Sequence, residues 1–273
     1  MIITKVKAVF FLVLTLPLAA QDRIIPLLIS EHHADHMEFF FRHNVNASAV
    51  MIVLDAHADT VVNENYGLIK ELVSEDNLSG ADKLAGNHNW IHPLQPAPLE
   101  RLIWISKIHG YPRSDKLEGF NRTISGWNSN IHAGYLSLEE LRFTEISGET
   151  LFVSVDLDFF YSENYGARDV PSVLDALFSF SLRWQGGVVW AICLSRPWLP
   201  DDDSAWLFLE KSLDWLHTRT EFNTPEISLF NRHREDTSRT AQAILSEGRE
   251  VPALREEDTP EHIKIKINRL FSQ

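Results

Sequence analysis

The sequence predicts an α/β domain, a three-layer α/β/α sandwich in which helices cover both faces of a mainly parallel sheet. Short apolar runs recur along the chain without strict polar alternation, as strands that are buried on both faces require. Stretches with helical features lie between several of these runs, and this alternation is typical of the architecture. The chain has 273 residues, of which 44% are hydrophobic, and this apolar content is sufficient for a large core.

Six apolar runs are predicted as strands of the sheet. Each is short and rich in β-branched or aromatic residues, and none has the regular alternation that a sheet with one solvent-exposed face would need. The runs cover residues 24–30, 50–56, 102–106, 151–159, 188–194 and 226–230.

Helices are predicted in three places. Pro171 suits the first turn of a helix over residues 173–184. Three consecutive aspartates precede a helix over residues 205–216, where they would complement the positive end of its dipole. The composition then becomes polar and charged over residues 231–260, which indicates a surface loop, and a last helix is predicted near residues 260–271.

The amino terminus has the order of a secretory signal. Lys5 and Lys7 precede the apolar residues 8–20, which end in small residues before a polar segment. This apolar run is shorter than the roughly 20 residues that span a bilayer as a helix. We expect cleavage after Ala20 and export to a periplasm or to the outside of the cell. A first buried strand or an uncleaved anchor is the alternative.

The charge balance bears on the partners of the protein. The chain carries 38 acidic against 25 basic residues, a formal net charge of −13. This surplus repels phosphate backbones and anionic lipids, so it argues against nucleic acid and against stable membrane association after signal cleavage. Cys193 stands alone, which excludes an internal disulfide and a thiolate zinc site. Residues 21–273 are predicted to form one domain with a polar extension from about residue 231.

Two groups of acidic residues follow predicted strands. Asp55, His57 and Asp59 come directly after the apolar residues 51–54, and Asp156 and Asp158 come where the strand that begins with residues 151–153 ends. In an extended chain, side chains two residues apart point to the same side. Ligands of open α/β sheets bind outside the carboxyl ends of the strands. We therefore expect these five side chains to converge at one edge of the sheet.

Four carboxylates gathered beside apolar strand ends need cations. Burial of an isolated carboxylate costs several kcal/mol, so such a group implies bound metal, strongly raised pKa values or an open location. Either motif alone is also typical of a turn or of a helix cap, but the two motifs together favour metal. Oxygen and imidazole ligands without a thiolate favour Mn²⁺, with Zn²⁺ and Fe²⁺ as alternatives.

These residues resemble a known superfamily. The sequence DAHAD at residues 55–59 and the sequence SVDLD at residues 154–158 are similar to the paired metal motifs of the arginase, agmatinase and histone-deacetylase (ureohydrolase) superfamily. The segment Asn-Trp-Ile-His-Pro at residues 89–93 is similar to one in an uncharacterised arginase-like (UPF-type) domain family within it. The resemblance covers roughly residues 24–200 and implies an arginase/deacetylase-like fold with a metal site.

The resemblance also implies a set of ligands. The superfamily takes one histidine from an upstream helix start, and His33 is the choice here, with His32 and His36 as competitors. Deacetylase-like members hold one zinc ion, whereas all the additional ligand types of the two-metal arginase-like members are present in this sequence. The ligands implied for two divalent ions are His33, Asp55, His57, Asp59, Asp156 and Asp158.

The resemblance implies a small-molecule substrate and hydrolysis of a non-peptide C–N bond in an amide, an amidine or a guanidine. Asp55 and Asp156 would bridge the two ions, and a hydroxide between the ions would be the nucleophile. The glycine-rich lead before the upstream histidine and the proline-containing tail of the second motif are both missing. Because loops after strands set substrate choice, hydrolysis of arginine or agmatine is not expected from the motifs alone.

Three further residues are candidates for roles in such a reaction. His88 is the candidate general acid that protonates a leaving amine, with His92 as a competitor. Asn89 is a candidate substrate-binding residue. Arg196, directly after a predicted strand, would hold a substrate carboxylate with two hydrogen bonds, although an exposed loop arginine is the alternative. Trp198 is expected in the core or in a pocket wall.

Two other functions fit parts of the same pattern. The first is a secreted metal-binding or ligand-binding protein that keeps the fold and the ligands but performs no reaction. The second is a two-metal phosphoesterase, because Asp55-Ala56-His57 and the later Gly86-Asn87-His88-Asn89 resemble motifs of that class. The phosphoesterase hypothesis leaves Asp156 and Asp158 without a role.

Overall fold

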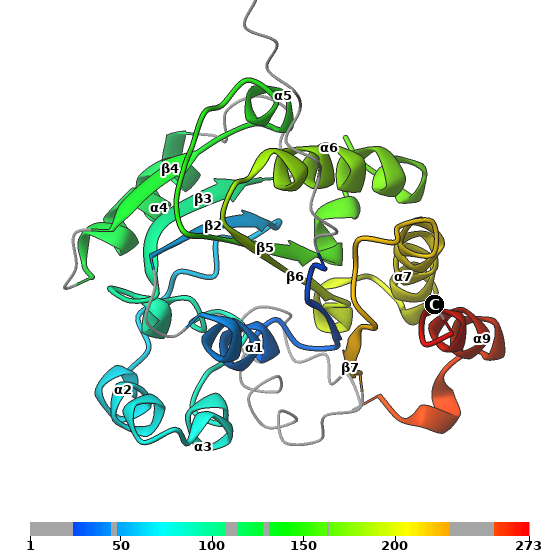
Figure 1. Cartoon of the computed structure of the whole chain (residues 1–273), viewed down its shortest axis with the longest axis horizontal. Helices are drawn as coiled ribbons and strands as arrows, with labels where there is room; N and C mark the ends of the chain where they lie inside the picture. Colours follow the sequence, from blue (N-terminus) through cyan, green and yellow to red (C-terminus); the bar gives the residue numbers. More distant parts are fainter. Residues whose placement is uncertain are drawn as a thin grey trace, which may run out of the picture.

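The computed structural model describes residues 24–44, 48–106, 114–127, 131–162, 164–229 and 254–272. Seven parallel strands form one sheet in the order β4-β3-β2-β5-β6-β1-β7 (Figure 1). The strands are β1 (Leu27–Ser30), β2 (Ala49–Leu54), β3 (Leu99–Ile105), β4 (His132–Tyr135), β5 (Thr150–Asp156), β6 (Gly187–Cys193) and β7 (Glu226–Ser228).

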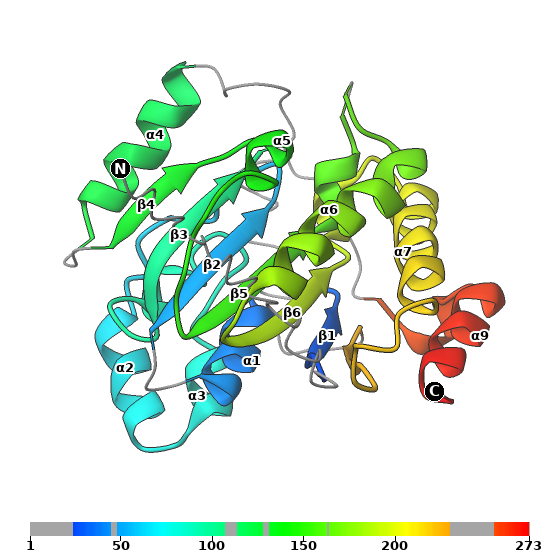
Figure 2. The same ribbon diagram turned by 45° about the horizontal axis from the view of Figure 1, so that its top comes forward.

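Helices pack on both faces of this sheet. One face is covered by α1 (Asp35–His43), α2 (Tyr66–Ser74), α3 (Leu78–Asp82) and α4 (Ser114–Ser125). The other face is covered by α5 (Leu138–Leu141), α6 (Val170–Arg183), α7 (Asp202–Leu216) and α9 (Glu261–Leu270). Figure 2 shows α6 lying across β5 and β6, with α7 and α9 beside it. The predicted three-layer α/β/α sandwich with a parallel sheet is confirmed.

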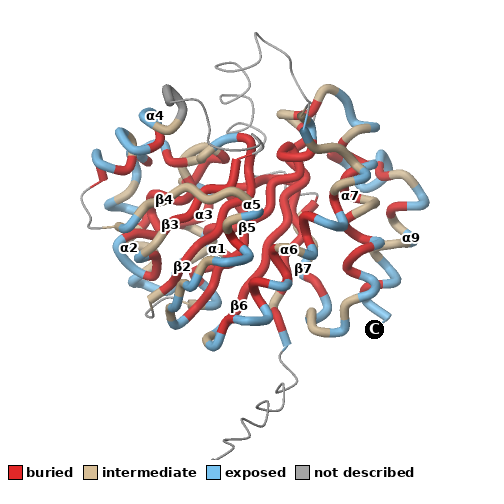
Figure 3. Tube along the Cα trace, turned by 90° about the horizontal axis from the view of Figure 1, so that it is seen from above, coloured by how far each residue is buried: buried red, intermediate tan, exposed pale blue. Residues whose placement is uncertain are grey.

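Alternation along the central strands divides the core between the two layers. In β2, Met51 and Val53 pack toward α1, whereas Ile52 and Leu54 pack toward α6. All six residues of β2 are buried, and Figure 3 shows the strands as the buried centre of the molecule. A strand with two buried faces has no polar face, which explains why polar alternation is absent from the sequence.

Helix α1 is fixed on the sheet by aromatic packing. The ring of Phe40 stacks on Phe152 of β5 with 4.4 Å between the ring centroids, and both side chains are fully buried. Truncation of such a buried aromatic residue to alanine costs about 3–5 kcal/mol in proteins. This packing also holds the loop before α1, which carries His32 and His33.

The predicted elements are present with shifted ends. The run predicted as a strand to residue 159 ends at Asp156, and residues Leu157–Phe160 form a 3-10 helix, η2, because the Asp156 side chain accepts the Asp158 N–H and turns the chain. The two long helices begin three residues earlier than predicted, at Val170 and Asp202. The short, half-exposed edge strand β4 was missed, since four residues at the edge of a sheet have no long apolar run.

Two predicted segments fall outside the described residues. The signal sequence at residues 1–20 is one, and most of the polar extension, residues 230–253, is the other. Within the described ranges, no helix combines the length and the apolar character that crossing a membrane would require.

The strand order reverses between β2 and β5. From β2 the chain continues outward through β3 to β4, and from β5 it continues in the opposite direction to β6. Leu54 pairs with Val155 in the parallel register, so Asp55 and Asp156 leave the sheet side by side. Ligands of open α/β sheets bind at such a switch point, beyond the carboxyl ends of the strands.

Candidate metal centre

The two acidic motifs form the same local turn. After β2, the His57 N–H donates to Asp55 Oδ1 at 2.7 Å, and after β5, the Asp158 N–H donates to Asp156 Oδ1 at 3.0 Å. An aspartate that accepts the N–H two residues further on is a common way to turn a chain. The motifs therefore do not continue as strands, and Asp59 adopts the left-handed conformation, with a φ of 47°.

The two turns are also tied to each other. The Ala56 N–H at the end of β2 donates to Asp158 Oδ1 at 3.2 Å. Asp55, Asp156 and Asp158 are each at least 97% buried. The sheet register and this cross-link together place three carboxylates in one buried cluster.

His33 completes one part of the cluster, which we call the inner group (His33, Asp55 and Asp59). The Nδ1 atom of His33 lies 2.6 Å from Asp59 Oδ2 and 3.4 Å from Asp55 Oδ2. It also lies 3.3 Å from Asp156 Oδ2. Ligand atoms of the inner group all lie within 4.8 Å of one another, so they could hold a metal ion.

His57 completes the other part, which we call the outer group (Asp55, His57 and Asp158). The His57 Nδ1 atom lies 3.1 Å from Asp158 Oδ2 and 3.8 Å from Asp55 Oδ1. These ligand atoms also lie within 4.8 Å of one another. Asp55 therefore presents one carboxylate oxygen to each group.

The buried polar atoms of this cluster fit a divalent cation. In the described part of the chain, His33 Nδ1 and Asp55 Oδ2 are buried without a hydrogen-bond partner of acceptable geometry. Such atoms are rare in folded proteins and need an explanation. Two groups of imidazole nitrogen and carboxylate oxygen, with no thiolate, are the donors that divalent ions such as Mn²⁺ prefer.

The electrostatics of the cluster also favour a bound cation. Burial, together with the charges of Asp59 and Asp158, raises the pKa of Asp55 well above its usual range. Burial and the charges of Asp158 and Asp55 likewise raise the pKa of Asp156. Burial lowers the pKa of His57, but the hydrogen bond and charge of Asp158 outweigh it and raise this pKa to about 9. Bound cations would relieve the repulsion that raises the carboxylate pKa values.

A hydroxyl group holds the far side of the His33 ring. Ser154 Oγ lies 2.7 Å from His33 Nε2 and 2.9 Å from Nδ1 of His36. If the Nε2 atom of His33 carries the proton and donates it to Ser154, Nδ1 is left with a free lone pair that faces the carboxylates. A partner on the second ring nitrogen is the usual way to fix the tautomer of a metal-binding histidine.

The competing histidines are held elsewhere. His36 contacts Ser154 and packs its ring edge-on against Trp90, while His32 Nε2 lies 3.9 Å from Glu31 Oε2. Of these neighbours, His33 is the one whose ring nitrogen faces the carboxylates.

Two tryptophans flank the centre, one on each side. The indole N–H of Trp90 donates to Asp59 Oδ2 at 3.0 Å, at the inner group. The ring of Trp198 lies 5.0 Å from the ring of His57, at the outer group. The His57 side chain is 51% exposed, whereas that of His33 is 1% exposed. The centre is thus accessible from the side of His57 and Trp198.

The candidate acid His88 lies in a segment that contacts the inner side of the centre. Its carbonyl accepts the N–H of Val61, two residues after Asp59, and the segment continues to Trp90. Its Nδ1 atom is buried and has no hydrogen-bond partner in the described ranges. The competitor His92 is buried against Tyr66 and Trp127, and its Nδ1 accepts a backbone N–H.

The side chains of the two proposed substrate-binding residues are engaged in protein contacts. Asn89 Oδ1 accepts hydrogen bonds from the Asn63 side chain and from the Gly86 N–H, which stabilise the loop. Arg196 is 5% exposed, and its guanidinium donates to Glu31 and, through two nitrogens, to Asp202. A role in substrate binding remains a prediction for both.

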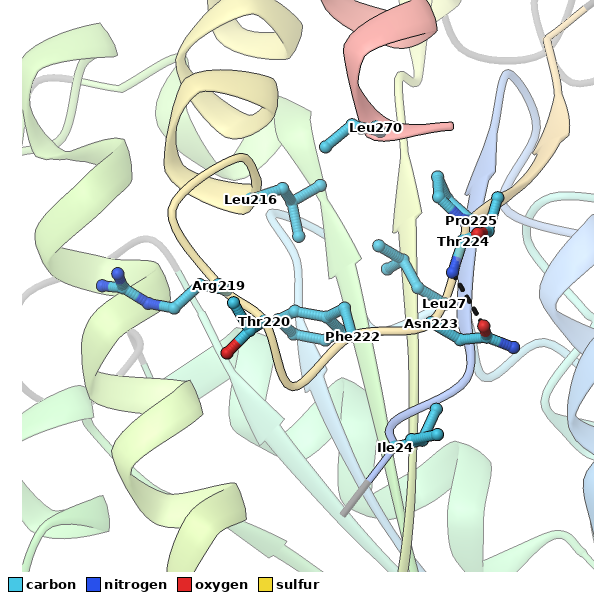
Figure 4. Close-up of a pocket in the computed structure, with 10 residues that line it drawn as sticks. All are labelled: Ile24, Leu27, Leu216, Arg219, Thr220, Phe222, Asn223, Thr224, Pro225 and Leu270. Atoms are coloured by element: carbon cyan, nitrogen blue, oxygen red, sulfur yellow. Dashed lines mark hydrogen bonds between the residues drawn. The ribbon is translucent and has the colours of Figure 1, made fainter. Parts of the chain in front are cut away.

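Three cavities in the described part of the chain are lined by residues outside both groups of possible metal ligands. One of them, with a volume of about 230 Å³, lies near the amino end of β1 and is lined by Leu27, Leu216 and Phe222 among others. Figure 4 shows these lining residues. The polar side chains drawn there include Asn223, whose Oδ1 accepts the Thr224 N–H. Neither of the two groups of possible metal ligands contributes to this cavity.

Several residues around the centre were not predicted from the sequence. Ser154 lies two positions before Asp156 on β5, so both side chains point to the same face, and this spacing was a usable signal. Glu31 is the first residue after β1 and Ser195 the second after β6, at the same edge of the sheet. Their partners depend on how the loops cross, which no local pattern indicates.

No protein-family model matches the chain, and no curated protein matches it. Among solved structures, it is similar to the crystal structure of Helicobacter pylori arginase, with 15% sequence identity and a TM-score of 0.39, over 71% of this chain and 73% of that one. A likeness of this extent carries no conclusion about activity, so function is argued from the residues of this chain.

Proposed function

We propose that this protein is a metal-dependent hydrolase that cleaves a non-peptide C–N bond in a small molecule. It would use two divalent ions, with Mn²⁺ as the preferred metal. The observation that carries the proposal is the position of Asp55, whose two oxygens face His33 on one side and His57 on the other. A carboxylate shared between two groups of ligands suits a pair of ions and has no evident use in an apolar core.

The residues of this chain would divide the work as follows. Bound divalent cations supply Lewis acidity and lower the pKa of water near them. The inner and outer groups would hold one cation each, and Asp156 would contribute from the side of His33. His88 would donate a proton to the departing nitrogen, because its segment contacts the inner group through Trp90. Trp198 would exclude water from one side of the substrate.

Metal analysis tests the first half of the proposal. Protein purified in manganese-supplemented medium is expected to retain about two ions per chain by elemental analysis, and Mn²⁺ titration after chelator treatment is expected to restore them. Fewer than one ion per chain under these conditions would rule out the two-metal enzyme.

An activity screen tests the second half. The loaded protein is incubated with a panel of amides, amidines and guanidines, and released ammonia, urea or amine is measured. Full occupancy without any release would favour a metal-binding protein without enzymatic activity. For an active substrate, His88→Ala is expected to lower kcat by about 10²–10⁴-fold. His262→Ala, which changes an exposed histidine on α9, is the matched control and should leave kcat unchanged.

A further inference from the structure

Ser195 has an unusual conformation beside the metal centre. It is the second residue after β6, is 4% exposed, and adopts the left-handed conformation, with a φ of 51° and a ψ of 38°. Residues other than glycine rarely adopt this conformation, and they keep it only where the surroundings hold them there. The Ser195 hydroxyl donates to Asp156 Oδ2 at 2.6 Å.

This hydrogen bond fixes the second oxygen of a candidate ligand. Asp156 Oδ1 already accepts the Asp158 N–H, so both oxygens of the carboxylate are held from the protein side. The oxygen that Ser195 contacts is the one that lies 3.3 Å from His33 Nδ1. The hydroxyl thus determines which way Asp156 faces at the inner group.

The turn that carries Ser195 is itself held from two directions. The Ser195 N–H donates to the Glu31 carbonyl at 3.2 Å, which joins the turn to the loop that carries His33. The next residue, Arg196, donates to Glu31 Oε1 at 3.0 Å, and it donates to both carboxylate oxygens of Asp202, at the start of α7, at 3.2 and 2.9 Å. A buried arginine between two carboxylates binds in a fixed geometry because its donors are planar.

We propose that Ser195 is a positioning residue for the metal centre: its hydroxyl aims Asp156 at the ion beside His33, and Arg196 holds the turn in place. This role deepens the proposed function and rests on it. It also explains why a serine occupies a position where glycine would be free of strain. Partners of this kind, one step behind the ligands, typically change metal affinity by about 10–100-fold when they are removed.

The test uses the full chain, treated with a chelator and then titrated with Mn²⁺ in a calorimeter. Ser195→Ala removes the hydroxyl and keeps the backbone strain, whereas Ser195→Gly removes both. Each is expected to weaken the binding of one of the two ions by about 10–100-fold and to leave the other ion little changed. The matched control is Ser212→Ala, which removes a fully buried hydroxyl bonded to the Phe208 carbonyl in α7 and should bind Mn²⁺ as the wild type does.

The outcomes distinguish the positioning role of Ser195 from the two-metal centre on which it rests. Wild-type affinity in both Ser195 variants, with two ions still bound by the wild type, overturns the positioning role and leaves the metal centre standing. Weak Mn²⁺ binding in Ser195→Ala with wild-type binding in Ser195→Gly also overturns it. Both variants lack the hydroxyl, so the backbone conformation would then be responsible for the loss of affinity. A wild-type chain that binds no Mn²⁺ removes both proposals. If Ser195→Ala does not fold, Ser195→Gly supplies the same comparison without strain.

Arg196 is tested separately. Arg196→Lys keeps the positive charge but loses the planar pair of hydrogen bonds to Asp202. It is expected to weaken the same ion by a smaller factor than Ser195→Ala. Unchanged affinity in a folded Arg196→Lys variant overturns the part assigned to Arg196.

Discussion

The inner and outer groups share Asp55 but differ in almost every other respect. The inner histidine, His33, is 1% exposed and has a hydroxyl partner on its far nitrogen, whereas the outer histidine, His57, is 51% exposed and has an aromatic ring beside it. The inner group also contains Asp59, whose carboxylate accepts a hydrogen bond from the indole N–H of Trp90. One group is thus supported on several sides, and the other is open.

This difference assigns different tasks to the two groups. Polar groups that are fixed before an ion arrives lose little freedom on binding, so the inner group should bind its ion more tightly. The outer group offers access to a substrate and should exchange its ion more readily. The proposed centre would therefore retain an ion at the inner group and admit a substrate at the outer group.

The largest effect is expected from removing the residue that both groups share. Asp55→Asn is expected to reduce binding from two ions to none, since an amide lacks the charge that each ion needs. The variant should lose the stabilisation by metal, which is about 2.7 kcal/mol at a free concentration of 100 times Kd. Without metal, it should be more stable than the wild type, because it removes a carboxylate whose pKa is raised by burial and repulsion.

Thermal unfolding with Mn²⁺ and with chelator measures both parts of this prediction. Asp214→Asn, an exposed residue of α7 that pairs with Lys266, is the control and should keep the response to Mn²⁺. If Asp55→Asn still binds one ion with the affinity of the wild type, Asp55 is not shared, and the two groups are independent sites.

A smaller effect is expected from changing one group at a time. His33→Asn should remove the tighter of the two binding steps and His57→Asn the weaker one, so that each variant binds about one ion. Calorimetric titration with Mn²⁺ resolves the two steps. Loss of the same step in both variants would abolish the distinction between inner and outer groups, and His262→Asn controls for the loss of an imidazole at the surface.

The outer group should also give the metal-free protein a pH dependence. The folded-state pKa of His57 is about 9 against an ordinary value of 6.5. A raised histidine pKa stabilises the fold below pH 6.5, and this contribution is lost as the pH rises through 9. The raised pKa of Asp55 also makes the stability of the fold decrease as the pH rises, but from a lower pH. The folded state holds a proton that the unfolded state releases above about pH 4.

Metal binding has the opposite pH dependence to the stability of the metal-free protein, because ligand nitrogens must lose their protons before they bind an ion. Mn²⁺ affinity is therefore expected to rise between pH 6.5 and 9. The decisive comparison is the unfolding temperature of chelator-treated wild type and His57→Asn across this range. The wild type should fall more steeply than the variant, and parallel curves would show that His57 does not titrate in this way.

The fold, and the gathering of acidic residues at one edge of the sheet, could be predicted from the sequence for physical reasons. A parallel sheet buried on both faces needs uninterrupted apolar strands, which are visible in a single sequence. Asp55 and Asp156 stand directly after such strands, and the switch point of the sheet brings them together. By contrast, the support given by Ser195 depends on the crossing of the loops after β1 and β6. Arg196 illustrates the same limit, since its partners Glu31 and Asp202 lie 165 and 6 positions away.

The smallest effect is expected at the edge of the outer group. Trp198→Ala removes a ring beside His57 but leaves all six candidate ligands in place, so both ions should bind as in the wild type. Because the ring would contact substrate without touching the reacting bond, the variant should raise KM by several-fold and change kcat little. The experiment compares KM, kcat and Mn²⁺ affinity for Trp198→Ala and Trp198→Phe on the best substrate from the screen. Phe keeps an aromatic face, so the KM of Trp198→Phe should lie closer to that of the wild type than the KM of Trp198→Ala does. A fall in kcat with unchanged KM would instead place Trp198 behind His57, as a support of the ligand, and the outer group would then resemble the inner one.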